Sequence, residues 1–122
     1  MANEKTCLIV DDAQFMRNIL KKILSQNGYK VVAEAENADQ GVEAYKNHKP
    51  DVVTMDICMP EKSGIEAIKE IFAYDEEALI LVCSALGQEL LVMEAIQAGA
   101  KDFIVKPFKA EKILETLKKV ME

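Results

Sequence analysis

Cysteine, histidine and long apolar runs are scarce in this sequence. Its 122 residues include three cysteines, Cys7, Cys58 and Cys83, and a single histidine, with no CxxC pair. Neither a disulfide framework nor a thiol-based metal site is therefore expected. Cys7 and Cys83 lie inside short apolar runs and are interpreted as small core residues. Because no apolar stretch approaches the length of a membrane span or a signal peptide, we expect a cytoplasmic protein.

Positive charge is also in short supply. Asp and Glu number 21 against 15 Lys and Arg, and the formal net charge is −6. This balance argues against nucleic acid as a direct partner and favours a cation. Repeats, low-complexity tracts and linker-like segments are missing as well, and 50% of the residues are hydrophobic, enough for one core. We predict a single domain over residues 1–122 with no output domain, and we expect a monomer.

What the sequence does have is a regular alternation of short apolar runs with longer amphipathic stretches. The predicted strands, rich in Val, Ile and Leu, cover residues 6–10, 30–35, 51–55, 78–83 and 102–105. Continuous apolar strands of this kind are typical of a parallel sheet buried on both faces. Helices between and after them are predicted from apolar stripes. These stripes are Phe15, Ile19, Ile23 and Leu24; Val42 and Tyr45 within 38–48; Ile65, Ile68 and Phe72; Leu91, Val92 and Ile96 within 88–98; and Ile113, Leu117, Val120 and Met121.

Five strand–helix units limit the possible architectures. A closed barrel of parallel strands needs eight units. We therefore predict an α/β fold with an open, doubly wound (βα)5 sheet of five parallel strands. For the strand order we expect 2-1-3-4-5, the order of flavodoxin-like folds, because no residue pattern in the sequence specifies which strands are neighbours. Ligands of such sheets bind beyond the carboxyl ends of the strands.

Polar side chains stand at the carboxyl ends of four predicted strands. They are Asp11 and Asp12, Asp56, Ser84, and Lys106. Taken singly, each has a structural explanation, since Asp and Ser commonly cap helices or form turns and a loop lysine is commonly solvated. Taken together, they are predicted to converge on one crevice, where three uncompensated carboxylates would repel one another unless a cation is bound.

The chemistry that fits this group is phosphoryl transfer assisted by a hard divalent cation. Oxygen ligands in a shallow crevice suit Mg²⁺ that keeps some of its waters. An aspartate can be a covalent phosphoryl acceptor, and Asp56 is the central candidate. Lys106 would neutralise one phosphoryl oxygen and the Ser84 hydroxyl would donate a hydrogen bond to another.

Four runs of the sequence resemble the receiver domains of bacterial response regulators in two-component systems. They are LIVDDAQFMR, DVVTMDICMPEKSGIE, ILVCSALGQ and AGAKDFIVKPF, and together they cover nearly the whole chain. The segments CSALGQ, KDFIVKPF and FMR are most similar to the chemotaxis branch of that family, the CheY-like receivers. The resemblance implies a phosphoacceptor signalling protein rather than an enzyme, one that assists its own phosphorylation and dephosphorylation.

The resemblance also implies roles for individual residues. Asp56 would be the phosphorylated residue, Asp11 and Asp12 the acidic pair that holds Mg²⁺, and Cys58 a ligand through its backbone carbonyl only. Ser84 would be the switch hydroxyl, Phe103 the aromatic switch, and Lys106 the lysine before a cis proline. Phosphorylation is expected to draw Ser84 toward the phosphoryl group and let Phe103 turn inward, although Phe103 could instead be a plain core residue.

Two positions depart from the best-known enterobacterial member. Phe103 replaces a tyrosine, so its inward state cannot use a phenolic hydrogen bond. Cys58 and Leu86, two residues after Asp56 and Ser84, are uncharged where that protein has an amide and an acid. Its dephosphorylation behaviour is therefore not carried over to this sequence.

The expected partners are a CheA-like histidine kinase and either a flagellar switch protein or a chemotaxis phosphatase. A relay role, in which the phosphoryl group passes to another histidine domain, remains open. An aspartyl-phosphate phosphatase is disfavoured because the DxD spacing is missing. A flavin module is disfavoured because an acidic pair follows the first strand where a flavin phosphate would need a phosphate loop.

Overall fold

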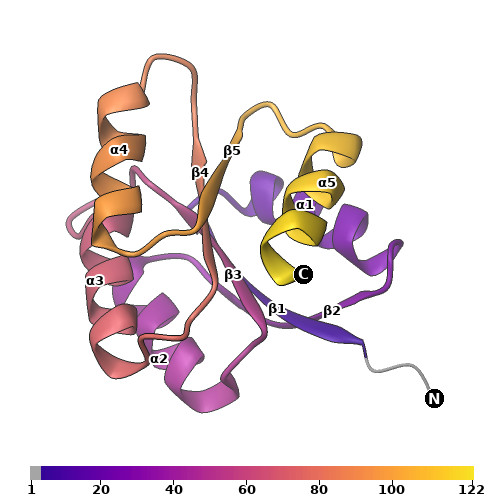
Figure 1. The fold of residues 1–122 in the computed structure, drawn as a ribbon, viewed down its shortest axis with the longest axis horizontal. Helices are drawn as coiled ribbons and strands as arrows, with labels where there is room; N and C mark the ends of the chain where they lie inside the picture. Colours follow the sequence, from indigo (N-terminus) through magenta and orange to yellow (C-terminus); the bar gives the residue numbers. More distant parts are fainter. Residues whose placement is uncertain (1–3) are drawn as a thin grey trace.

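The computed structural model describes residues 4–122, in which strands and helices alternate strictly (Figure 1). The elements in chain order are β1 (Lys5–Val10), α1 (Gln14–Ser25), β2 (Tyr29–Ala35), α2 (Ala38–His48), β3 (Val52–Asp56), α3 (Gly64–Tyr74), β4 (Ile80–Ser84), α4 (Glu89–Ala98), β5 (Asp102–Val105) and α5 (Ala110–Met121). Every predicted strand is present, and its ends differ from the prediction by at most two residues. Within the described residues, no helix is long and apolar enough to cross a bilayer.

The strands form one parallel sheet in the order β2-β1-β3-β4-β5, which confirms the predicted fold class. The chain therefore winds outward in one direction from β1 to β2, and in the other direction through β3, β4 and β5. The point of reversal lies between β1 and β3, whose carboxyl ends are neighbours in the sheet.

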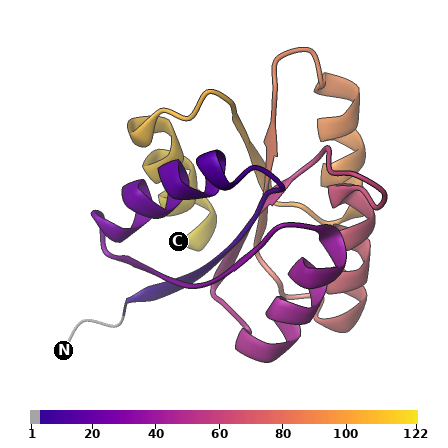
Figure 2. The same ribbon diagram turned by 180° about the vertical axis from the view of Figure 1, so that it is seen from behind.

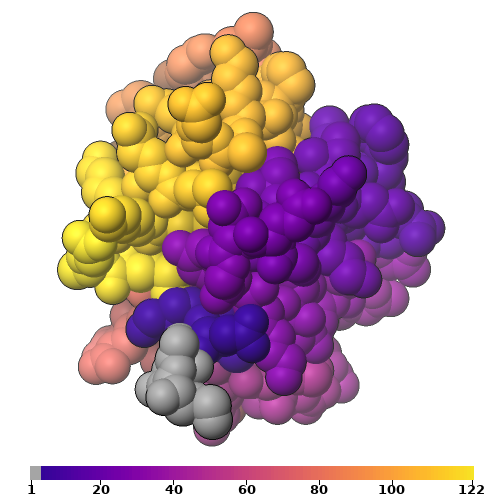
Figure 3. All heavy atoms as spheres, turned by 90° about the vertical axis from the view of Figure 1, so that its right-hand side faces the viewer, coloured from indigo at the N-terminus to yellow at the C-terminus, as the bar shows by residue number. Residues whose placement is uncertain are grey.

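Helices cover both faces of this sheet, as Figures 1 and 2 show from opposite sides. On one face, Leu20 and Leu24 of α1 and Ile113 and Leu117 of α5 pack on the sheet. In the space-filling view of that side, the atoms of α5 lie beside those of α1 (Figure 3). The other face carries α2, α3 and α4. Alternate residues of one strand serve the two faces, for example Cys7 on the first and Leu8 on the second.

Local sequence signals fix the ends of several helices. The Asn37 side chain accepts a hydrogen bond from the N–H of Gln40 and caps α2, and Ser63 caps α3 in the same way through Glu66. After α4, Gly99 adopts a φ of 129° close to the Phe72 ring, a position that a side chain could not occupy without collision. Asn37 and Ser63 thus fix the loops that follow β2 and β3 at the carboxyl edge of the sheet, whereas Gly99 lies in the loop before β5, at the opposite edge.

Two apolar stripes predicted from periodicity are wrong in part. Phe15 is 71% exposed, because the buried side of α1 contains Arg17, Leu20 and Leu24 instead. Ile96 is also exposed, since α4 buries only Ala95 fully. In both helices the apolar residues outnumber those that the sheet can cover.

Candidate functional site

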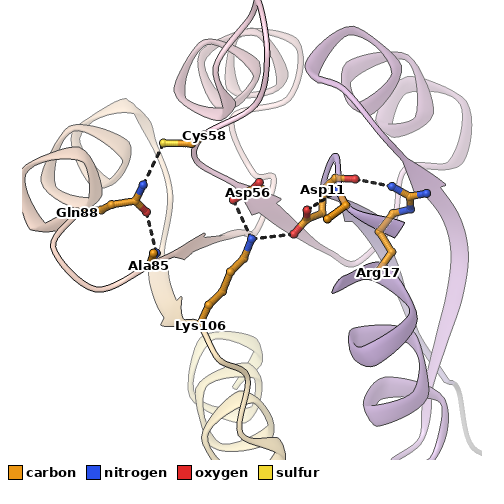
Figure 4. A network of polar contacts seen from close by, with 8 residues as sticks. Asp11, Arg17, Asp56, Cys58, Ala85, Gln88 and Lys106 are labelled. Carbon is orange, nitrogen blue, oxygen red and sulfur yellow. Dashed lines mark hydrogen bonds and ion pairs between the residues drawn. The ribbon is translucent and has the colours of Figure 1, made fainter. Parts of the chain in front are cut away.

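The carboxyl edge of the sheet brings together the predicted polar side chains (Figure 4). Asp11 follows β1, Asp56 is the last residue of β3, and Lys106 follows β5. Carboxylate oxygens of Asp11, Asp12 and Asp56 lie within 4.8 Å of one another. The convergence predicted from the strand order is therefore confirmed for these residues.

Lys106 bridges two of the three carboxylates. Its Nζ lies 3.0 Å from Asp11 Oδ2 and 3.2 Å from Asp56 Oδ1. The second oxygen of Asp11 accepts a hydrogen bond from the N–H of Ala13 at 2.9 Å. Asp11 and Asp56 are buried and Asp12 is exposed, so the crevice opens to water on the Asp12 side. Lys106 is thus an element of the site and not a solvated loop lysine.

The charges of the site do not cancel. Burial, together with the negative charges of Asp11 and Asp12, raises the pKa of Asp56 to about 6 against the opposing effect of Lys106. Burial lowers the pKa of Lys106, but its contacts with Asp11 and Asp56 outweigh burial, and the net direction is upward. Three carboxylates facing one ammonium leave an excess of negative charge in the crevice.

This donor set fits a hard divalent cation. It offers carboxylate oxygens from three residues, two of them held firmly and one facing water, and hard cations such as Mg²⁺ prefer oxygen ligands and retain water. The Cys58 thiol is exposed and accepts a hydrogen bond from Gln88 Nε2 at 3.0 Å, so its sulfur is engaged away from the carboxylates (Figure 4). A role for the Cys58 carbonyl as a ligand stays a prediction.

The helix-cap explanations of Asp12 and Ser84 are wrong. The N-cap residue of α1 is Ala13, without a side-chain hydrogen bond, and α4 begins at Glu89 with Gln88 as its N-cap. Ser84 is instead the buried last residue of β4, and its carbonyl accepts a hydrogen bond from the Lys106 N–H at 2.7 Å. It therefore stands on the strand next to that of Asp56, and its role as the switch hydroxyl stays a prediction.

Phe103 lies on β5 and is 43% exposed, so the plain-core interpretation is wrong. With Leu86 and Val105 it lines a groove beside Ser84. The bond between Lys106 and Pro107 is cis, as the family resemblance implied. The outward ring is one of the two positions that the predicted switch requires.

Three residues that position the site were not identified from the sequence. A Cβ on Gly64 would overlap the carbonyl oxygen of Asp56, so α3 can approach β3 only because this residue lacks a side chain. Arg17 donates to the carbonyl oxygen of Asp11 (Figure 4). The Gln88 side chain accepts a hydrogen bond from the Ala85 N–H and donates one to Cys58 Sγ. All three residues lie within the motif runs, but nothing in their spacing indicates these contacts.

Comparisons with known proteins agree with this geometry. A family model for the response regulator receiver domain matches residues 7–118. The chain belongs to this family. It is 61% identical over 114 residues to the chemotaxis protein CheY of Bacillus subtilis, covering 93% of this chain and 95% of that protein. It is 60% identical over 116 residues to CheY of Thermotoga maritima, covering 95% and 97%.

Solved structures of receiver domains superpose closely on this one. In the CheX–CheY–BeF3–Mg²⁺ complex from Borrelia burgdorferi, the matching chain gives a TM-score of 0.92 at 38% identity, with coverage of 97% of this chain and 90% of that one. The response regulator domain of Thermotoga maritima CheB gives 0.89 at 38% identity, with coverage of 98% and 97%. This receiver domain is therefore a signalling module of the CheY type.

Proposed function

We propose that this receiver domain is a single-domain chemotaxis response regulator that is phosphorylated on Asp56 by a histidine kinase. The observation that carries the proposal is the contact of Lys106 with Asp56 and Asp11 at the switch point of the sheet. A buried nucleophilic carboxylate beside one ammonium is suited to receive an anionic group. The high identity to CheY proteins supports the chemotaxis assignment.

Besides Mg²⁺ and the kinase phosphohistidine, the proposed transfer uses side chains of this chain that are already in place. An Asp56 oxygen attacks the phosphorus of a kinase phosphohistidine, a P–O bond forms as the P–N bond breaks, and the departing imidazole takes up a proton. The pKa of Asp56 at about 6 leaves the carboxylate mostly ionised at neutral pH, as a nucleophile must be. Lys106 stays protonated and balances charge on a phosphoryl oxygen.

Asp11, Asp12 and Asp56 would hold the Mg²⁺, with the Cys58 carbonyl as a further ligand. Bound there, the ion would neutralise negative charge on the phosphoryl oxygens. The residues themselves contribute orientation, because Asp11 is fixed by the Ala13 N–H and by Lys106. The open side at Asp12 leaves room for water ligands and for the approaching phosphohistidine.

Phosphorylation would change the surface around Phe103. The Ser84 hydroxyl would donate to the phosphoryl group, and the groove beside Ser84, lined by Leu86, Val105 and Phe103, would admit the ring. Burial of a phenylalanine contributes about 1.5 to 3 kcal/mol, which matches typical allosteric couplings of about 1 to 3 kcal/mol. A flagellar switch protein or a chemotaxis phosphatase would respond to this change.

A labelling experiment tests the acceptor. Acetyl phosphate or a phosphorylated histidine kinase should label the wild type only with Mg²⁺ present, and mass spectrometry should locate the label on Asp56. Asp56→Asn should fold and remain unlabelled, whereas Lys106→Ala should accept the label but respond to it weakly. A label on another residue, or undiminished labelling in EDTA, would overturn the assignment.

A binding experiment tests the switch. Phosphorylated wild type should bind its target several-fold more tightly than unphosphorylated protein, and Phe103→Ala should reduce that ratio without reducing labelling. Phe15→Ala is the matched control, because it removes an exposed ring of the same size from α1. Equal ratios for the wild type and Phe103→Ala would show that the ring is not part of the switch. A gain in affinity only for a second histidine domain would favour the relay role.

A further inference from the structure

Arg17 is a buried cation that the proposed phosphoryl transfer does not use. It lies in the first turn of α1, and its side chain is only 10% exposed. A guanidinium in such a place needs acceptors for its donors. Its Nε donates to Glu34 Oε1 at 3.2 Å, and its Nη1 donates to the backbone carbonyl oxygen of Asp11 at 2.6 Å (Figure 4).

The bond to Asp11 falls on the peptide that joins the two adjacent acidic residues. The Asp11 carbonyl oxygen and the Asp12 N–H belong to one rigid plane. A donor that fixes this oxygen therefore also fixes the direction in which the Asp12 backbone leaves the turn. Among the described residues, the Asp12 carboxylate has no hydrogen bond or ion pair of its own, whereas the Asp11 carboxylate is held by Ala13 and Lys106.

Glu34 completes the arrangement from the neighbouring strand β2. It balances the charge of Arg17. It also forms an ion pair with Lys21, whose Nζ lies 3.2 Å from Glu34 Oε2. Lys21 is 54% exposed, and among residues 4–122 its only ion pair is with Glu34, so the same carboxylate has one basic partner that contacts Asp11 and one that does not. This difference provides a matched control within the chain.

We propose that Arg17 is a positioning residue for the divalent cation site, acting through the Asp11–Asp12 peptide. The inference rests on the proposed function, since it concerns the same carboxylates. Charge repulsion and positioning predict opposite effects of removing Arg17 on the affinity for Mg²⁺. As a nearby positive charge, Arg17 repels a cation, and its removal would increase affinity. As a positioning residue, it holds the carboxylates in place, and its removal decreases affinity.

The test is a titration of the metal-free protein with MgCl2 at constant ionic strength, followed by backbone amide NMR shifts. Arg17→Ala should raise the Kd for Mg²⁺ by about 3- to 10-fold, at or below the lower end of what loss of a ligand-orienting partner costs. Lys21→Ala should leave the Kd unchanged or lower it slightly. Arg17→Ala combined with Glu34→Gln keeps the net charge of the wild type and should still raise the Kd.

A kinetic measurement separates a specific loss of Mg²⁺ affinity from a general loss of the labelling reaction. The Mg²⁺ concentration that half-saturates labelling of Asp56 by acetyl phosphate should rise in Arg17→Ala, while the rate at saturating Mg²⁺ returns to that of the wild type. If Arg17→Ala does not fold, Arg17→Lys provides the same test, because it keeps the charge but lacks the planar fork that contacts both acceptors.

The outcomes distinguish the inference from the function on which it rests. A wild type without Mg²⁺-dependent shifts would overturn both. A wild type that binds Mg²⁺, with Arg17→Ala binding equally or more tightly, would overturn only the role of Arg17. An equal loss of affinity in Lys21→Ala would also overturn it, because that substitution leaves the bond to Asp11 in place.

Discussion

Replacing Asp56 with asparagine should stabilise the metal-free protein while abolishing phosphorylation. The substitution keeps the size of the side chain and an oxygen that can accept from Lys106. It removes a charge that is buried and faces the carboxylates of Asp11 and Asp12. Burial of this charge, together with its repulsion by the neighbouring carboxylates, is therefore a cost to the metal-free fold.

The size of this cost follows from the pKa of Asp56. A rise of the pKa from the ordinary aspartate value of 3.8 to about 6 corresponds to roughly 3 kcal/mol, because each pKa unit is about 1.4 kcal/mol. This figure is a ceiling, since the open side of the crevice lets solvent screen the charges. For a domain of this size, 1 kcal/mol shifts the midpoint of thermal unfolding by about 4 °C, so Asp56→Asn should gain up to about 10 °C.

The gain should depend on pH in a definite direction. Below about pH 4, Asp56 is protonated in both the folded and the unfolded chain, and asparagine brings no electrostatic benefit. Between about pH 4 and pH 6 the unfolded chain releases the proton while the folded protein retains it, so the stability that Asp56 contributes is lost as pH rises. The difference between variant and wild type should therefore grow from pH 4 and level off above about pH 7.

Thermal unfolding followed by circular dichroism in EDTA, from about pH 4.5 to pH 8, measures this difference. Asp12→Asn serves as the control, because it removes the same charge from an exposed position of the same site and should gain less. Mg²⁺ in excess should stabilise the wild type more than Asp56→Asn. The reasoning is refuted if Asp56→Asn gains the same amount at pH 4.5 as at pH 7.5, or if it gains nothing at either.

Two further predictions concern the packing beneath the site. Gly64→Ala should destabilise the fold by about 1 to 3 kcal/mol or more in urea unfolding and impair labelling, because the new Cβ meets backbone; Gly41→Ala, which meets only a valine side chain, should cost less. Thr54→Val should be neutral or stabilise by about 1 kcal/mol, because the Thr54 hydroxyl is buried without a hydrogen-bond partner in the part of the chain that the structure describes. Thr116→Val should lack that benefit, since its hydroxyl donates to a carbonyl within α5, and equal effects of the two valine substitutions would contradict this explanation.

The fold was largely predictable because its signals are local and repeated. Each strand is a short apolar run and each loop has its own turn residues, so the element ends were located to within a few residues. The residues at strand ends were predictable for the same reason, since parallel strands bring their carboxyl ends to one edge. The strand order itself came from the fold class, because no residue pattern specifies which strands are neighbours.

Helix α1 shows why the rest was not predictable. An apolar pattern selects a stripe of Phe15, Ile19, Ile23 and Leu24, and a charged residue such as Arg17 counts against burial. In the folded protein Arg17 is buried because a carbonyl oxygen and a carboxylate from two other segments accept its donors. Both acceptors lie outside the helix, so periodicity wrongly placed Phe15 on the buried face and missed Arg17, although it placed Leu24 there correctly.

Lys106 connects the predicted phosphorylation site to the predicted switch through covalent and hydrogen-bonded steps. Its side chain contacts the ends of β1 and β3, and its N–H donates to the Ser84 carbonyl at the end of β4. Phe103 lies three residues earlier on β5, at the groove beside Ser84. Under the proposed function, a phosphoryl group on Asp56 would draw the ammonium away from Asp11 and shift the backbone between Ser84 and Phe103. Coupling between the phosphorylation site and the surface at Phe103 then requires only the short strand β5. Substitutions at Lys106 and at Phe103 can test this path.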